Sequence, residues 1–210
     1  MKKLFLLSLI VLMSIPVMKA QNKIEDIPLA EPQRTGGMPL YDALNQRATH
    51  REFSDAMLDV AHLSNLLWAA NGINREDGKR TAPSARNCQE IDIYVYTAKG
   101  VYLYVPEKNM LKAVVAGDYR SECAIQPFAV QCPVILVFVA NYDKMKGMDQ
   151  DAKEFYGATD GGYVSQNVYL YCAAENLNTV VLGSIHRDKI QKLLGFNGKA
   201  ILGQAVGYTK

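Results

Sequence analysis

Residues 134–140 (VILVFVA) are all apolar, and this run constrains the fold more than any other segment. A strand that is apolar at every position is typical of a sheet in which both faces are buried. Residues 179–182 indicate a second buried strand, and residues 200–207 indicate a last one. Residues 91–96 and 101–105 are β-rich runs joined around Lys99-Gly100, which predicts a hairpin. The chain therefore builds a sheet with a fully buried interior.

Other segments predict helices between these strands. Residues 59–71 are the clearest, because Asp59 is a suitable N-cap, apolar residues recur on one face, and Gly72 ends the pattern. Residues 160–176 predict the longest helix. Shorter helices are expected at residues 39–46, 110–116, 121–129 and 187–194. A hairpin and isolated strands with interspersed helices indicate an α+β fold rather than a regular βαβ array.

Length and composition indicate one domain, over residues 39–210. The chain has 210 residues, of which 49% are hydrophobic, and this suffices for one sizeable core. Its 23 basic and 21 acidic residues give a net charge of +2, with no long run of either sign. A nucleic-acid surface would cluster Lys and Arg along one stretch, so no nucleic-acid partner is expected.

The N-terminus has the features of an export signal. Met1-Lys2-Lys3 is basic, residues 4–18 are mostly apolar, and Ala20 offers a small residue for cleavage. The apolar run is short for a membrane span, although an uncleaved anchor is the alternative. We expect residues 1–20 to be a signal peptide and the protein to be exported, to the periplasm. Residues 21–38, rich in Pro and Gly, predict an extended arm.

The four cysteines leave the redox state open. Export permits disulfides, and Cys123 and Cys132 are close enough in sequence to pair, but neither they nor Cys88 are assigned a partner. Cys172 lies in an apolar helical stretch, where a buried thiol is expected. Neither the cysteines nor the three histidines show metal-ligand spacing, so no metal site is expected.

Two short polar segments carry the chemistry. Residues 47–53 (RATHREF) offer two guanidinium groups and a hydroxyl, which suit a phosphate or an electron-rich ring edge. Residues 83–89 (PSARNCQ) offer a hydroxyl, an amide and backbone groups at an irregular turn, which suit a planar heterocycle. The alternatives are that Arg47 and Arg51 share a solvated helix end, and that Ser84 and Asn87 only form a turn.

Together the two segments resemble the flavin-binding signature of the nitroreductase family. Residues 47–53 are similar to the family pattern Arg-Arg-Ser-x-Arg-x-Phe. The resemblance implies that Arg47 holds the phosphate of FMN, that Thr49 assists it, and that Arg51 lies against the pyrimidine edge of the ring. Ala48 replaces the usual basic or polar residue, so only its backbone is expected to contact the cofactor.

The second segment is similar to the family pattern Pro-Ser-Ser-x-Asn-x-Gln, with Ala85 in place of the second Ser. The resemblance implies that Pro83, Ser84 and Ala85 line the ring and that Asn87 binds it from the partner subunit. It also implies a mostly antiparallel central sheet flanked by helices, in an intertwined homodimer whose active sites are shared.

The C-terminal part extends the resemblance to nearly the whole of residues 40–210. Leu182 and Gly183 follow a buried strand and resemble the family's backbone contact to the ring nitrogen. Relatives continue further and add basic residues for the phosphate, whereas here Lys210 is the last residue. The phosphate is therefore left to Arg47 and Lys210, with Arg187 as a third candidate.

The implied function is an FMN-dependent oxidoreductase that passes two electrons in turn from a donor to a nitroaromatic, a quinone or a similar small acceptor. The donor is left open between NAD(P)H, a quinol and a redox protein. One alternative is a non-catalytic module that binds flavin or another ligand. A second alternative is an enzyme that oxidises azoline rings in peptides, because residues 67–72 and 80–84 resemble segments of that branch of the family. No catalytic side chain is assigned.

Overall fold

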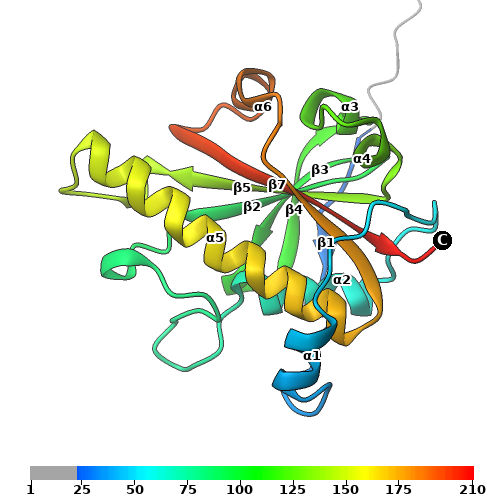
Figure 1. Cartoon of the computed structure of the whole chain (residues 1–210). Coiled ribbons are helices and arrows are strands. Elements are labelled where there is room, and N and C mark those ends of the chain that lie inside the picture. The colour runs from blue at the N-terminus through cyan, green and yellow to red at the C-terminus, as the bar shows by residue number, and fades with distance from the viewer. Residues whose placement is uncertain (1–22) are drawn as a thin grey trace, which may run out of the picture.

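The computed structural model describes residues 23–210, so the expected signal peptide at residues 1–20 lies outside the described residues. Seven strands form one sheet in the order β1-β4-β3-β2-β5-β7-β6, and every neighbouring pair is antiparallel. The strands are β1 (Ile27–Pro28), β2 (Ile91–Tyr96), β3 (Gly100–Val105), β4 (Met110–Ala116), β5 (Val134–Asn141), β6 (Leu177–Leu182) and β7 (Gly198–Tyr208). The α+β class with an antiparallel sheet is confirmed (Figure 1).

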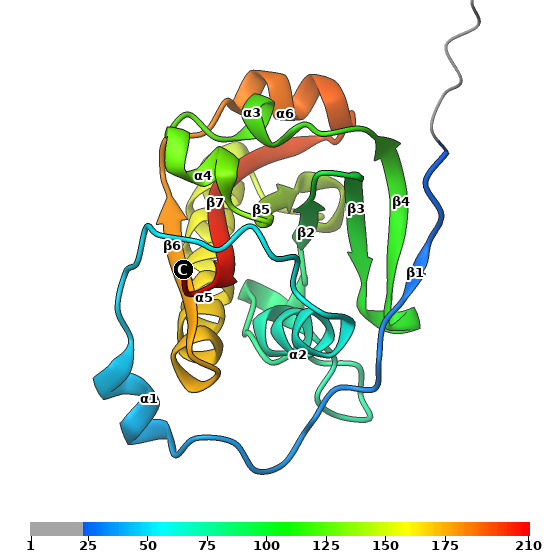
Figure 2. The ribbon, with the colours of Figure 1, turned by 90° about the vertical axis from the view of Figure 1, so that its right-hand side faces the viewer.

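The helices cover both faces of this sheet. They are α1 (Leu40–Gln46), α2 (Val60–Asn71), α3 (Arg120–Cys123), α4 (Pro127–Gln131), α5 (Gln150–Ala174) and α6 (Arg187–Leu194). Three short 3-10 turns are η1 (Ala85–Asn87), η2 (Pro106–Lys108) and η3 (Tyr142–Lys144). Helices α2 and α5 pack on one face, and α3, α4 and α6 pack on the other (Figure 2). None of the helices within residues 23–210 has both the length and the hydrophobicity of a membrane span.

Strand β5 lies at the centre of the core, as its uniform apolarity predicts. Leu136 and Phe138 face the cluster under α2 and α5, whereas Ile135 and Val137 face the cluster under α3, α4 and α6. Each of these four side chains is fully buried. Alternate side chains of one strand thus enter two separate cores, because successive residues point to opposite faces of a sheet.

Three predicted helices differ from the structure. Residues 110–116 form strand β4 rather than a helix, because Tyr104 of β3 pairs with Leu111 and tertiary pairing overrides weak local propensity. Residues 121–129 do not form one helix: Pro127, which cannot donate to a preceding carbonyl, begins the separate α4. Helix α5 starts well before residue 160, at Gln150.

The predicted helices α1, α2 and α6 and the predicted hairpin β2–β3 are confirmed. Asp59 caps α2 by accepting a hydrogen bond from the backbone N–H of His62 at 2.7 Å. On the N-terminal side of α1, residues 23–38 run along the outside of the domain and add β1 to the edge of the sheet at β4. Near the end of this arm, the guanidinium of Arg34 lies 5.9 Å from the ring centre of Trp68 on α2.

Candidate functional site

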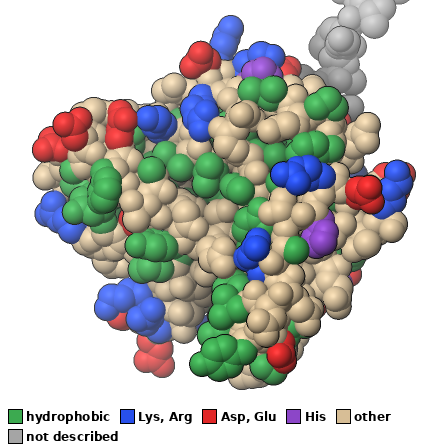
Figure 3. All heavy atoms as spheres, viewed as in Figure 1, with side chains coloured by type: hydrophobic (Ala, Val, Ile, Leu, Met, Phe, Trp, Pro, Cys, Tyr) green, Lys and Arg blue, Asp and Glu red, His purple; other side chains and the backbone are tan. Residues whose placement is uncertain are grey.

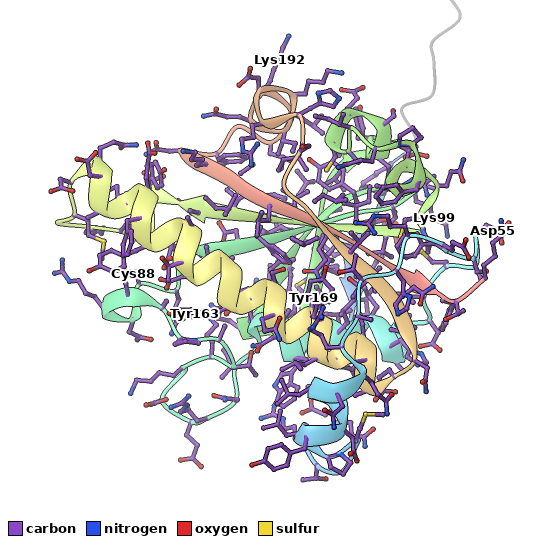
Figure 4. The ribbon with its side chains drawn as sticks, in the orientation of Figure 1. Asp55, Cys88, Lys99, Tyr163, Tyr169 and Lys192 are labelled. Carbon is purple, nitrogen blue, oxygen red and sulfur yellow. The ribbon has the colours of Figure 1, made fainter. Side chains whose placement is uncertain are left out.

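Tyr169, in the C-terminal part of α5, organises the first polar segment (Figure 4). Its buried phenol oxygen lies 3.0 Å from the hydroxyl of Thr49 and accepts a hydrogen bond from the backbone N–H of Val181, also at 3.0 Å. The guanidinium carbon of Arg47 lies 5.4 Å from the centre of the same ring. One side chain therefore links Arg47 and Thr49 to strand β6.

The same segment is also tied to β6 through its backbone. The N–H of His50 donates to the carbonyl of Thr179 at 3.0 Å. Strand β6 then ends at Leu182, and Gly183 follows with an exposed backbone. A Cβ placed on Gly183 would meet nothing within 4 Å, so the space beside it is open. The structure thus brings Arg47, Thr49 and the end of β6 to one side of α5.

Arg51 lies between two cavities next to this segment. The larger, of about 620 Å³, is bordered by Gln46, by residues 49–52 and by the junction of α5 and β6. The smaller, of about 230 Å³, is lined by Arg51, Lys210, Phe128 and Gln131 together with Glu52 and Phe53. The predicted cations Arg51 and Lys210 therefore meet at one cavity, although they are far apart in sequence. Ala48 is half-buried between Arg47 and Thr49.

Arg187 does not supply a free cation. Its guanidinium donates to the carbonyls of Gly183 at 3.0 Å, Ala200 at 2.9 Å and Ile201 at 2.9 Å. These bonds hold the turn after β6 against β7. Arg187 therefore fixes the backbone around Gly183, and the phosphate role considered for it does not fit this geometry.

The second polar segment forms a strained loop. Arg86, Asn87 and Gln89 have φ angles of 55°, 55° and 50°, a left-handed conformation that non-glycine residues seldom adopt. The hydroxyl of Ser84 accepts a hydrogen bond from the backbone N–H of Gln89 at 2.9 Å. Such strain persists only where the surroundings hold it, and it is typical of functional loops.

The loop is held from two sides. The backbone N–H of Ala85 donates to a carboxylate oxygen of Asp160 on α5 at 2.8 Å. On the other side, the Nε of Arg80 donates to the amide oxygen of Gln89 at 3.0 Å. The exposed Asn87 accepts a hydrogen bond from the amide of Gln89 at 3.2 Å. Pro83 is likewise exposed at the start of the loop.

Arg80 is the buried anchor of this region. Besides Gln89, it binds the carbonyl of Asn71 at the end of α2 at 3.2 Å and the carboxylate of Glu107 at 2.7 Å.

We expect Arg80→Ala to lower the free energy of unfolding by about 2 kcal/mol, because buried acceptors lose a charged donor. Urea denaturation measures this change. Lys108→Ala, at an exposed neighbouring cation, is the control and is expected to stay within about 0.5 kcal/mol of the wild type; equal effects would contradict the anchoring role.

One protomer does not bring the two polar segments together. The first segment is attached to α5 at Tyr169 and the second at Asp160, and these positions are about 14 Å apart along the helix axis. Figure 4 shows the same separation, with Cys88 of the loop and Tyr169 at different places along α5. Asn87 therefore does not meet Arg47 and Thr49 within one chain.

The cysteines are free thiols, and the pairing considered for Cys123 and Cys132 is absent from the described residues. Burial raises the pKa of each of these two thiols to about 12. The thiol of Cys132 donates to the carbonyls of Val134 and Val206 at 3.2 and 3.0 Å. Cys172 is fully buried, as predicted.

Comparison with known proteins decides the family. The sequence profile described as the Nitroreductase family matches residues 44–208. The chain belongs to the nitroreductase family. A protein of Methanocaldococcus jannaschii that carries the name nitroreductase is 31% identical over 178 residues, which is 80% of this chain and 90% of that protein.

Solved structures agree with this nitroreductase assignment. A crystal structure of a Ralstonia eutropha protein, also named as a nitroreductase, is 40% identical, covers 89% of this chain and 90% of its own, and has a TM-score of 0.83. A chain of the Escherichia coli microcin synthetase complex shares the fold at 17% identity and a TM-score of 0.66, over 98% of this chain and 85% of its own. Members of the nitroreductase family generally use flavin.

Sequence reasoning missed the residues that hold the segments in place. Tyr169 and Asp160 match no part of the nitroreductase motifs, and the resemblance of residues 80–84 assigns Arg80 no role, yet each of the three holds a segment by a specific contact. Tyr169 is one of twelve tyrosines and lies 120 residues from Thr49. No local pattern distinguishes it from the others, so only the packed structure identifies it.

Proposed function

We propose that this nitroreductase-family protein is an exported, FMN-dependent oxidoreductase that passes two electrons in turn from a donor to a small acceptor. The observation that carries the proposal is the convergence of Arg47, Thr49 and the end of β6 around Tyr169, beside the cavities bordered by Arg51. When bound, FMN would supply the redox chemistry, and the protein would bind and orient it.

The residues present fit FMN. Its phosphate needs cations, for which Arg47 and Lys210 are the candidates, and Arg51 lines one cavity together with Lys210. The cavity of about 620 Å³ has the size of an ordinary cofactor site. Gly183 leaves open space beside an exposed backbone, so the flat ring can approach it closely.

Each element would have a separate part in binding. Arg47, Thr49 and Lys210 would hold the phosphate side, and Arg51 would face the pyrimidine edge, where a cation favours electron uptake. The backbone of Leu182 and Gly183 would face the ring. Tyr169 would keep Thr49 and Arg47 in position, because its hydroxyl is already hydrogen-bonded to Val181 on β6.

The second half of the site would come from a partner subunit. Within one chain, Asn87 lies away from Arg47 and Thr49, so a homodimer is needed to complete the ring contacts. Helix α1 exposes 62% of Leu40 and 81% of Tyr41, and α5 exposes 65% of Phe155. Figure 3 shows hydrophobic side chains gathered over α1 and α5 on the same face. Such apolar surface is typical of an interface between subunits.

The acceptor would be a nitroaromatic, a quinone or a similar small molecule, and the donor NAD(P)H, a quinol or a redox protein. Export is proposed from the signal-like residues 1–20. It favours a quinol or a redox protein as the donor, since NAD(P)H is not expected outside the inner membrane. The electrons would pass in alternation, with donor and acceptor using the site in turn.

The test is to purify the protein, record its visible spectrum and titrate it with FMN. The expected result is a yellow protein, or a colourless one that takes up FMN in a saturable way, with one flavin per chain. Stopped-flow reduction by dithionite, followed by rapid reoxidation by a quinone or a nitroaromatic, would support the enzyme. A colourless protein that does not bind FMN would overturn the proposal, and bound flavin that does not exchange electrons would favour a binding module.

A further inference from the structure

The C-terminal end of β7 is tied to the start of α2 by three polar side chains, those of Asp59, His62 and Tyr208. The hydroxyl of Tyr208 donates to a carboxylate oxygen of Asp59 at 3.3 Å and accepts from the backbone N–H of Asp59 at 3.4 Å. The Nδ1 of His62 lies 2.9 Å from the same carboxylate oxygen and 3.3 Å from the hydroxyl of Tyr208. These contacts join residues that are up to 149 positions apart in the sequence.

Asp59 is the acceptor at the centre of this cluster. Its other carboxylate oxygen accepts from the backbone N–H of His62 at 2.7 Å, the contact that caps α2. The hydrogen bonds from the backbone and then the side chain of His62 hold the pKa of Asp59 below its usual range, so the carboxylate is ionised at neutral pH. A hydrogen bond to an ionised acceptor is stronger than one between neutral groups, which favours the bond from Tyr208.

The ring and the backbone of Tyr208 are held as well as its hydroxyl. The rings of His62 and Tyr208 meet edge to face, with 5.6 Å between their centres and an angle of 85° between their planes. The backbone of Tyr208 pairs with Leu177 of β6, and its carbonyl accepts from the N–H of Ser54 at 3.0 Å. Tyr208 is thus fixed to α2, to β6 and to the segment that follows residues 47–53 (Figure 2).

Lys210 lies two residues beyond this anchor. An extended chain spans at most about 3.6 Å per residue, so the backbone of Lys210 stays within about 7 Å of that of Tyr208. Between them, the hydroxyl of Thr209 donates to the carbonyl of Asn176 at 3.4 Å. Lys210 lines the cavity of about 230 Å³ together with Arg51. The position of Tyr208 therefore limits where the ammonium of Lys210 can reach.

We propose that Tyr208 is a positioning residue that, through Asp59 and His62, holds Lys210 at the cavity shared with Arg51 and thereby favours a flavin with a phosphate over one without it. The inference deepens the proposed function and rests on it for the identity of the ligand. Among residues 23–210, those that line this cavity do not include Tyr208, so its effect on the ligand passes through Lys210.

The first measurement tests the anchor in the purified, flavin-free protein. Tyr208→Phe keeps the ring and removes only the hydroxyl that binds Asp59. We expect the amide of Ser54, which donates to the carbonyl of Tyr208, to exchange with deuterium about three- to tenfold faster in this variant. Tyr163→Phe, the same change at an exposed position of α5, is the control and should exchange like the wild type. Unchanged protection of Ser54 in Tyr208→Phe would overturn the anchor.

The second measurement compares FMN with riboflavin, which has the same ring and no phosphate. Tyr208→Phe is expected to bind FMN about three- to tenfold more weakly and to bind riboflavin like the wild type. The variant that combines Tyr208→Phe with Lys210→Ala should bind FMN no more weakly than Lys210→Ala alone, because Tyr208 acts through Lys210. An equal loss of affinity for both flavins, or additive losses in the combined variant, would show a general structural role and contradict the proposal.

Asp59→Asn separates the anchor from the helix cap. Asparagine caps helices about as well as aspartate, so α2 keeps its start. Its neutral amide is a weaker acceptor for the hydroxyl of Tyr208, so the affinity for FMN should fall as in Tyr208→Phe while the affinity for riboflavin is kept. Wild-type affinity for FMN in Asp59→Asn would mean that the cluster has no influence on Lys210.

The two proposals can fail separately. If the protein binds no flavin but Tyr208→Phe speeds the exchange of Ser54, the proposed function is wrong and the anchoring of β7 stands. If FMN binds and Tyr208→Phe changes neither the exchange of Ser54 nor the affinity for FMN, the positioning role of Tyr208 is wrong and the proposed function stands.

Discussion

We expect the replacement of Arg51 by alanine to weaken the proposed binding of FMN by about 10- to 100-fold. The reason is that a hydrogen bond from a charged donor contributes about 1.5–3 kcal/mol, and about 1.4 kcal/mol corresponds to a tenfold change in affinity. Arg51 is exposed and borders both cavities of the site, so its removal leaves the fold intact. Quenching of flavin fluorescence on titration with the purified variant measures the dissociation constant.

Two further variants make the Arg51 result specific. Arg51→Lys keeps the charge but not the planar pair of donors, so it should retain part of the affinity. Lys192→Ala removes one positive charge from the exposed face of α6, away from Tyr169 (Figure 4), and should bind FMN like the wild type. If Arg51→Ala and Lys192→Ala bind FMN equally well, Arg51 has no part in the site.

Replacing Gly198 by alanine destabilises the protein by about 4 kcal/mol or more, an effect that single substitutions reach only through a severe clash or a buried defect. Gly198 begins β7 and pairs with Asn141 of β5. A Cβ at this position would lie 1.9 Å from the carbonyl oxygen of Ala140, and a backbone atom of the paired strand β5 cannot easily move aside. Urea denaturation followed by circular dichroism measures the change in free energy.

The matched control is Gly162→Ala. Gly162 lies inside α5, and a Cβ there would meet nothing within 4 Å. Because glycine costs about 0.5–1 kcal/mol in a helix relative to alanine, this variant should be slightly more stable than the wild type. A Gly198→Ala protein within about 1 kcal/mol of the wild type would contradict the close approach of β5 and β7.

Two contacts restrain the strained loop at residues 83–89 from opposite sides. Arg80 holds the loop from one side through Gln89, and Asp160 holds it from the other through Ala85. We therefore expect the loop to lose order when either contact is removed.

The motif residues and the buried strand were accessible from the sequence because their signals are local. The apolar run of β5 predicts burial on both faces, and both cores confirm it. Residues 47–53 and 83–89 predict the family, which the comparisons confirm. By contrast, the predicted helix at residues 110–116 is wrong, because the pairing of β4 with β3 and β1 depends on residues outside that window.

The sequence alone thus determined the class of fold, the strand buried on both faces and the family. Only the tertiary structure decided that Tyr169 joins Thr49 to β6 across 120 positions of sequence and that Asp160 holds Ala85 across 75. The physical reason is that propensity and hydrophobic period act over a few residues, whereas hydrogen bonds between buried groups depend on which surfaces the packed core brings into contact.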